Sequence, residues 1–189
     1  MQAPQKPRQT CPFSVNCLAV IGPCGHRQFY DLSRRGTGKR SGYTGKDHAK
    51  LLKEEIIPKM KSFYAKVNAD LPEDQRIRPI LQQDGASIHR AKEVKEVLES
   101  RHGMNYIRNW PSYSPDLAVI ENVFGDMKSQ CGSQLAKVKG RSQESRAKIV
   151  KIADKWLMSR SDSYIDNHIK SLRKRLDLCR KTRGEYVHY

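Results

Sequence analysis

Two acidic residues stand where they could do chemistry together. Asp84 follows the apolar run "ILQQ", which is typical of a short strand, and Glu121 lies in "SPDLAVIENVFGDMKS", whose apolar residues recur at helical spacing. Sites in open parallel sheets gather at the carboxyl ends of the strands. Residues 85–120 are long enough for a helix, a strand and a turn, so the chain can return Glu121 to the strand end that carries Asp84.

A pair of carboxylates at that place would suit a magnesium ion. Mg²⁺ binds few protein carboxylates and fills its remaining octahedral positions with water and substrate phosphate. Two such ions roughly 4 Å apart can activate an attacking hydroxyl and stabilise the leaving oxygen of an in-line displacement. Taken alone, Asp84 is better explained as a strand-end cap and Glu121 as a solvated helix carboxylate than as catalytic residues.

The overall charge predicts a polyanionic partner. The 189 residues include 36 Lys and Arg against 20 Asp and Glu, a formal net charge of +16. Nucleic acid fits this surplus best, and a merely solvated basic surface is the alternative. The loop "RRGTGKRSGYTGK" lacks the glycine spacing of a Walker phosphate loop. The cations expected to contact a phosphate backbone lie in this loop and in a basic C-terminal helix: Arg34, Arg35, Lys39, Arg40, Lys46, Lys170, Arg173, Lys174 and Arg175.

The order of elements predicts an α/β fold. "FSVNCLAVIG" and "RQFYDLS" read as a hairpin, and residues 47–67 as a crossover helix that Pro58 kinks or breaks. "RPILQQ", "RAKEVKEVLESRH" and "MNYIRN" follow as strand, helix and parallel strand. Ser114 and Pro115 are typical of a helix start, which places Glu121 one turn into the next helix. Further helices are expected over 141–158 and 162–179.

Cysteine and hydropathy patterns favour a soluble intracellular protein. The five cysteines are an odd number without a CxxC pair, so reduced thiols are favoured over a disulfide framework or a zinc site. No apolar run approaches the roughly 18 residues that a membrane helix needs.

At two places the sequence resembles the Tc1/mariner-like DDE transposases. "QQDGASIHRAKEVKEVL" resembles the family segment QQDNAPxH, and "NWPSYSPDLAVIENVFGDMK" is similar to WPxxSPDLNPIENLWxxxK. "FSVNCLAVIG" and "SLRKRLDLCRKTRGEYVHY" are similar to a family strand and to the family's carboxyl terminus. The resemblance therefore runs from about residue 14 to the end of the sequence.

The resemblance implies specific roles for individual residues. Asp84 would be the second catalytic, metal-binding acid and Glu121 the third, with Mg²⁺ or Mn²⁺ as the cofactor. His89 matches the histidine of the first motif, and it either neighbours the site or simply begins its helix. Asn122 would be a second site neighbour. The motifs also depart from the family pattern at Gly85, Ser87, Ala118, Val119 and Phe124.

The family's first catalytic aspartate has no counterpart here. It lies on a strand before the hairpin, whereas this sequence has no Asp or Glu before Asp31. Asp31 is a poor substitute, because three strand spacings, about 14 Å, would separate it from Asp84 in a sheet ordered 3-2-1-4-5. The expected fold is thus an RNase H-like mixed sheet flanked by helices, lacking the usual first strand, with C-terminal helices added.

The resulting prediction is an N-terminally truncated transposase domain. Residues 1–12 would form an irregular arm, 13–135 a partial RNase H-like core, and 136–189 a basic helical extension of the same domain. The intact ancestor would cut and join DNA, while this chain alone would be inactive. The alternatives are a non-enzymatic nucleic-acid-binding remnant, a domesticated DNA-binding or interaction protein, and a truncated gene product. The resemblance further implies DNA as the partner, a nuclear location and a homodimer like those of related transposases.

Overall fold

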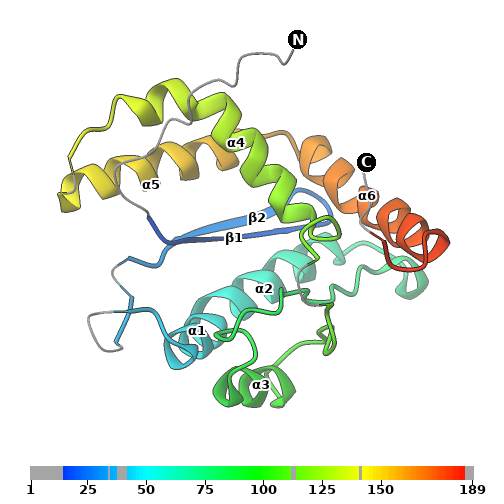
Figure 1. The fold of residues 1–189 in the computed structure, drawn as a ribbon. Coiled ribbons are helices and arrows are strands. Elements are labelled where there is room, and N and C mark those ends of the chain that lie inside the picture. The colour runs from blue at the N-terminus through cyan, green and yellow to red at the C-terminus, as the bar shows by residue number, and fades with distance from the viewer. Residues whose placement is uncertain (1–14, 34, 38–41, 112–113, 141, 186–189) are drawn as a thin grey trace, which may run out of the picture.

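A β-hairpin lies at the centre of the molecule (Figure 1). The computed structural model describes residues 15–33, 35–37, 42–111, 114–140 and 142–185, so the arm expected over 1–12 lies outside the described residues. Strand β1 (Cys17–Gly22) pairs antiparallel with β2 (His26–Asp31), with Cys17 opposite Asp31 and Gly22 opposite His26. The predicted hairpin is confirmed.

The predicted crossover helix is also present, with an irregular turn before its proline. It comprises α1 (Gly45–Leu51), a π-helical turn η2 (Leu52–Ile56) and α2 (Ile57–Val67). Pro58 has no N–H and its ring clashes with the carbonyl four residues earlier, so the ordinary α-helical hydrogen bond cannot form there. The backbone N–H of Ile57 instead bonds to the carbonyl of Leu52, five residues back, and the helix continues without a break.

The parallel pair that should carry Asp84 is shorter than predicted. Its two strands are reduced to one parallel bridge between Leu81 and Tyr106, in which the N–H of Leu81 bonds to the carbonyl of Asn105 (2.8 Å) and that of Ile107 to the carbonyl of Leu81 (2.9 Å). Pro79 lacks a donor to extend the ladder. The 3₁₀ turn η3 (Glu73–Gln75) precedes the bridge, and α3 (Lys92–Glu99) connects its two sides. In the described part of the chain no strand pairs with the free edge of β1.

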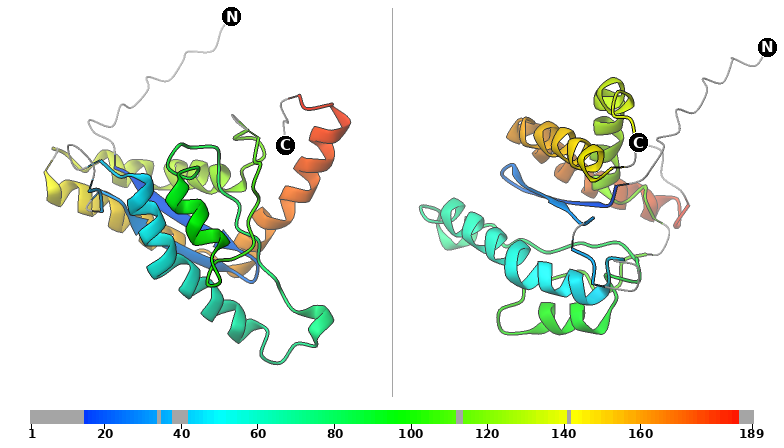
Figure 2. Two further views of the ribbon diagram at one scale, coloured as in Figure 1. Left: turned by 90° about the horizontal axis from the view of Figure 1, so that it is seen from below. Right: turned by 90° about the vertical axis from the view of Figure 1, so that its left-hand side faces the viewer.

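Three longer helices complete the fold. They are α4 (Val119–Ala136), α5 (Gln143–Met158) and α6 (Asp162–Lys181), and they cover one face of the hairpin while α1, α2 and α3 lie on the other side (Figures 1 and 2). Alternate hairpin residues serve the two layers: Leu18 and Val20 pack with the core of α1–α3, whereas Ala19 and Ile21 pack with that of α4–α6. The hairpin therefore joins the two layers.

The start of α4 differs from the prediction. Residues 115–117 form a turn in which the N–H of Leu117 bonds to the carbonyl of Ser114 (3.3 Å), and the helix begins only at Val119. Glu121 therefore lies in the first turn of α4 rather than after it.

None of the helices in the described ranges has the length and apolar character needed to span a membrane.

Candidate functional site

The carboxylate of Asp84 is held by its own loop. Asp84 follows the Leu81 bridge, and its Oδ1 accepts a hydrogen bond from the backbone N–H of Ala86 (3.0 Å). Nδ1 of His89 lies 2.6 Å from the same oxygen. A carboxylate can only accept, so His89 donates through Nδ1–H. Asp84 keeps 58% of its side chain exposed, against 13% for His89. His89 is thus a direct neighbour of the acid.

A second, fully buried histidine supports His89 from α1. The rings of His48 and His89 lie 4.6 Å apart between centroids. Nε2 of His48 is 2.6 Å from the amide nitrogen of Gln83, and its Nδ1 is 3.2 Å from the hydroxyl of Tyr43. Burial, reinforced by the nearby charge of His89, lowers the pKa of His48 to about 3 despite the opposing effect of Asp84. His48 is therefore neutral near pH 7, as its bond from an amide donor requires.

Close packing brings α1 against the Asp84 loop. Gly45 begins α1, and an added Cβ there would collide with the Cβ of Ala91. The first turn is fixed by a capping box, in which the N–H of Asp47 bonds to the Thr44 hydroxyl (3.3 Å) and the N–H of Thr44 to the Asp47 carboxylate (2.8 Å). These contacts hold His48 at its place beside His89.

Glu121 reaches the same region from α4. The turn before it is buried at Asp116, Leu117 and Ala118, and the N–H of Glu121 bonds to the carbonyl of Ala118 (3.0 Å). The Glu121 side chain itself is exposed. The packed turn therefore presents this carboxylate at the surface.

Asp84 and Glu121 border one hollow of about 350 Å³. Its lining also includes the exposed cation Arg90 and the indole of Trp110. The predicted meeting of the two acids is thus compatible with their places in the fold. Asp31 is not part of this lining, and its Oδ1 accepts a hydrogen bond from the N–H of Ser33 (2.9 Å).

The donor set fits a weakly held divalent ion. Mg²⁺ is commonly bound through one or two carboxylates, with water and substrate phosphate completing its shell. Hydrogen bonds from the described residues converge on Oδ1 of Asp84 and none reaches its Oδ2, which leaves that oxygen for a metal ion. Across the described ranges, no group of three or more His, Cys, Asp or Glu side chains is arranged to hold a metal. Two carboxylates are the protein's contribution at this hollow.

The cations expected to contact DNA have different surroundings. Arg34, Lys39 and Arg40 lie outside the described residues. Arg35 forms an ion pair with Glu55. Exposed side chains are found at Lys46, Lys170, Arg173 and Lys174.

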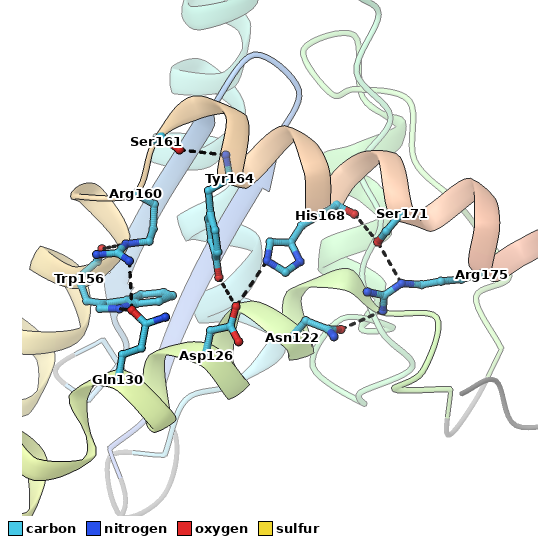
Figure 3. A network of polar contacts seen from close by, with 10 residues as sticks. All are labelled: Asn122, Asp126, Gln130, Trp156, Arg160, Ser161, Tyr164, His168, Ser171 and Arg175. Atoms are coloured by element: carbon cyan, nitrogen blue, oxygen red, sulfur yellow. Dashed lines mark hydrogen bonds and ion pairs between the residues drawn. The ribbon is translucent and has the colours of Figure 1, made fainter. Parts of the chain in front are cut away.

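Arg175 and Asn122 are bonded to each other. The Arg175 side chain is only 2% exposed, and its NH1 donates to the backbone carbonyl of Asp116 (3.0 Å) and to Oδ1 of Asn122 (2.9 Å). This burial does not fit the DNA contact predicted for Arg175. Asn122, the residue after Glu121, accepts this hydrogen bond from α6 (Figure 3).

The burial of two polar residues was not predicted, although the sequence contains a signal for it. His48 precedes Leu52 and Ile56 at four-residue spacing, so it continues the buried stripe of the crossover helix. Arg175 continues the stripe of Ile165 and Leu172 along α6, whereas the apolar Leu176 beside it is 44% exposed. Helical spacing identifies both positions as buried, although a polar residue type by itself predicts exposure.

Comparison with known proteins identifies the family. A sequence profile described as DDE superfamily endonuclease matches residues 45–143, a segment that contains both acids and their connecting elements. The chain belongs to the DDE superfamily endonucleases. The family predicted from the sequence is thereby confirmed. None of the curated proteins matches the chain significantly.

Solved structures show that this DDE endonuclease chain has the fold of a mariner transposase catalytic domain. The Mos1 transposase catalytic domain with raltegravir and Mn is 20% identical, with a TM-score of 0.57, covering 92% of this chain and 84% of Mos1. The Mos1 mariner transposase catalytic domain alone is 20% identical with a TM-score of 0.54, and the match covers 92% of this chain and 82% of the Mos1 chain. For the Mos1 strand transfer complex the identity is 20% and the TM-score 0.57, and the match covers 100% of this chain and 51% of the Mos1 chain. This likeness confirms the predicted RNase H-like fold class.

Proposed function

We propose that this DDE superfamily chain is a transposase-type domain that binds DNA and holds a divalent metal ion between Asp84 and Glu121. The observation that carries the proposal is that these two carboxylates, from segments far apart in the sequence, border one hollow. The Mos1 catalytic domain has been solved with Mn and with Mg, and Mos1 also as a strand transfer complex and a paired end complex. These relatives support Mg²⁺ or Mn²⁺ as the ion and DNA as the partner.

The proposal assigns roles to four residues at the hollow or next to it. Asp84 and Glu121 hold the metal, and His89 orients Asp84 through Oδ1. Arg90, exposed at the border of the hollow, is placed to contact a DNA phosphate. The bound metal would neutralise charge on a phosphodiester and lower the pKa of an attacking water.

The proposal includes inactivity of this chain by itself. DDE chemistry uses three acids, and the sequence has no Asp or Glu before Asp31, whose carboxylate is turned to Ser33. The family resemblance implies that the strand carrying the first acid lies between the hairpin and the segment that ends at Asp84, and in the described part of the chain no strand pairs with the edge of β1 that faces away from β2. DNA cleavage and strand transfer are therefore properties proposed for the ancestor, and both would require an additional carboxylate.

A non-enzymatic DNA-binding protein is the second candidate. It is favoured by the net charge of +16 and by the exposed cations Lys170, Arg173 and Lys174 of α6. Such a domesticated protein would act in the nucleus, bind DNA through phosphate contacts and need no metal. As in related transposases, a homodimer is the proposed assembly in either case.

Metal binding tests the two candidates against each other. We would titrate the purified protein with Mn²⁺, follow the free ion by electron paramagnetic resonance, and assay cleavage and strand transfer of DNA under the same conditions. The proposed site predicts Mn²⁺ binding that is lost in both Asp84→Asn and Glu121→Gln, with no DNA product from any variant.

The matched control is Glu54→Gln, which removes an exposed helix carboxylate outside the lining of the hollow. It should bind Mn²⁺ like the unaltered protein. Mn²⁺ binding that neither site variant changes would reject the metal site and leave the DNA-binding protein. Strand transfer by the unaltered chain would instead overturn the proposed inactivity.

A further inference from the structure

Arg175 is a buried cation on α6, a helix whose other Lys and Arg side chains are exposed. Its side chain is 2% exposed, whereas Arg173 and Lys174 beside it are exposed. Removing a charge from water is costly unless hydrogen bonds and opposite charge compensate for it. Arg175 therefore has to be explained by the groups it binds.

Two of those groups lie on either side of Glu121 in the sequence. NH1 of Arg175 donates to the carbonyl of Asp116, in the turn before α4, and to Oδ1 of Asn122, the residue after Glu121. One guanidinium thus ties the turn to the first turn of the helix, and Figure 3 shows its contact with Asn122. The Glu121 carboxylate projects from the short segment between these two contacts.

The place of Arg175 is itself set within α6. Its Nε donates to the hydroxyl of Ser171 (3.1 Å), which in turn donates to the carbonyl of His168 (2.7 Å). The imidazole of His168 lies 3.7 Å from the Asp126 carboxylate of α4, which also accepts a hydrogen bond from Tyr164 (2.7 Å). These contacts fix the register of α6 on α4.

A third contact continues this seam toward α5. The indole of Trp156 donates to the amide oxygen of Gln130 (3.0 Å), and the guanidinium of Arg160 donates to the same oxygen (3.1 Å). Asn122, Asp126 and Gln130 follow one another at four-residue spacing, so one polar face of α4 meets α5 and α6 along several turns (Figure 3). Arg175 holds the end of this seam that lies beside Glu121.

We propose that Arg175 is a positioning residue for Glu121. It locks the turn at Asp116 to the start of α4 and so presents the carboxylate to the metal. The inference rests on the proposed function, because it takes Glu121 to be a metal ligand. Residues behind metal ligands typically contribute 10–100-fold to metal affinity by orienting them.

The experiment compares Arg175→Met and Arg175→Lys with Arg173→Met in the full chain. Methionine replaces the buried arginine with a flexible apolar side chain, and lysine retains the charge without the forked donors. The matched control removes an exposed charge two residues away. Circular dichroism first establishes a temperature at which all four proteins are folded.

Two readouts are then taken at that temperature. Amide hydrogen exchange by NMR follows Leu117, Ala118 and Glu121, whose N–H groups are bonded within the turn and the first turn of α4. Mn²⁺ affinity is measured by electron paramagnetic resonance. Arg175→Met should speed exchange at these three amides and weaken Mn²⁺ binding by about tenfold or more. Arg175→Lys should recover part of both losses, and Arg173→Met should match the unaltered protein.

The outcomes separate this inference from the proposed function. If Arg175→Met is folded and less heat-stable but keeps both the exchange rates and the Mn²⁺ affinity, Arg175 is only structural and the inference fails. If the unaltered protein binds no Mn²⁺, the proposed function fails and the inference falls with it.

Discussion

His48 shows how a buried side chain ties the stability of the fold to pH. It is fully buried, and burial holds its pKa near 3, below the value of about 6.5 for an unfolded chain. The unfolded state therefore takes up a proton below about pH 6.5 that the folded state takes up only near pH 3. Stability contributed by neutral His48 is complete above about pH 6.5 and is lost progressively as the pH falls toward 3.

We expect His48→Gln to reduce this pH dependence. Between pH 7.5 and pH 5 the unaltered protein should lose about 2 kcal/mol more of its free energy of unfolding than the variant, because a 1.5-unit interval below the unfolded pKa corresponds to that amount. Urea unfolding at the two pH values measures it. His26 and His168, whose pKa values burial also lowers, are common to both proteins and cancel in the comparison. Equal losses would show that His48 is protonated in the folded state.

At the scale of elements, the hairpin turn joins the central strands to α6. Cys24 and Gly25 have φ values of 60° and 72°, in the left-handed region, and they are the central residues of a turn in which the N–H of His26 bonds to the carbonyl of Pro23 (3.4 Å). The N–H of Gly25 donates to the Asp166 carboxylate (3.1 Å), and Arg27 forms an ion pair with Asp162. α6 thus binds both the hairpin turn and, through Arg175, the start of α4.

Two substitutions in this turn should have opposite effects. Cys24→Asn should raise the free energy of unfolding by about 0.5–1 kcal/mol, because Asn tolerates a positive φ better than Cys does. Gly25→Ala should lower it by about 1–3 kcal/mol, because its Cβ would be strained at φ 72° and would collide with the Asp162 side chain. Thermal and urea unfolding measure both changes. A stabilising Gly25→Ala would contradict the turn geometry.

Elements were predictable where the local pattern alone decided them. The hairpin, the crossover helix and the last two helices follow from apolar periodicity and turn residues. The start of α4 did not, because Ser114 and Pro115 satisfy the rule for a helix start while the chain uses them for a turn. The placement of Asp84 and Glu121 at the border of one hollow was predictable from a topological rule. The partners of Arg175 were not, since they lie 53 and 59 residues away and depend on how α6 packs.

At the scale of the whole molecule, part of the excess positive charge lies on the exposed surface of α6. The net charge is +16, and α6 presents Lys170, Arg173 and Lys174 at the surface while Arg175 beneath them contacts the start of α4. A DNA duplex lying along these cations would follow α6, the helix whose Arg175 contacts the start of α4. Affinity gained in this way comes from released counterions, so it must fall with added salt.

We therefore expect the triple variant Lys170→Ala, Arg173→Ala, Lys174→Ala to bind duplex DNA with a weaker salt dependence. Each lost phosphate contact reduces the slope of log affinity against log salt by about 0.9, so three contacts reduce it by between two and three. The matched control removes the same charge from the other helical layer, at the exposed Lys53, Lys66 and Lys95. Fluorescence anisotropy at several salt concentrations measures both slopes. Equal reductions would mean that net charge alone holds the DNA, whereas a reduction confined to the α6 variant places the duplex along α6.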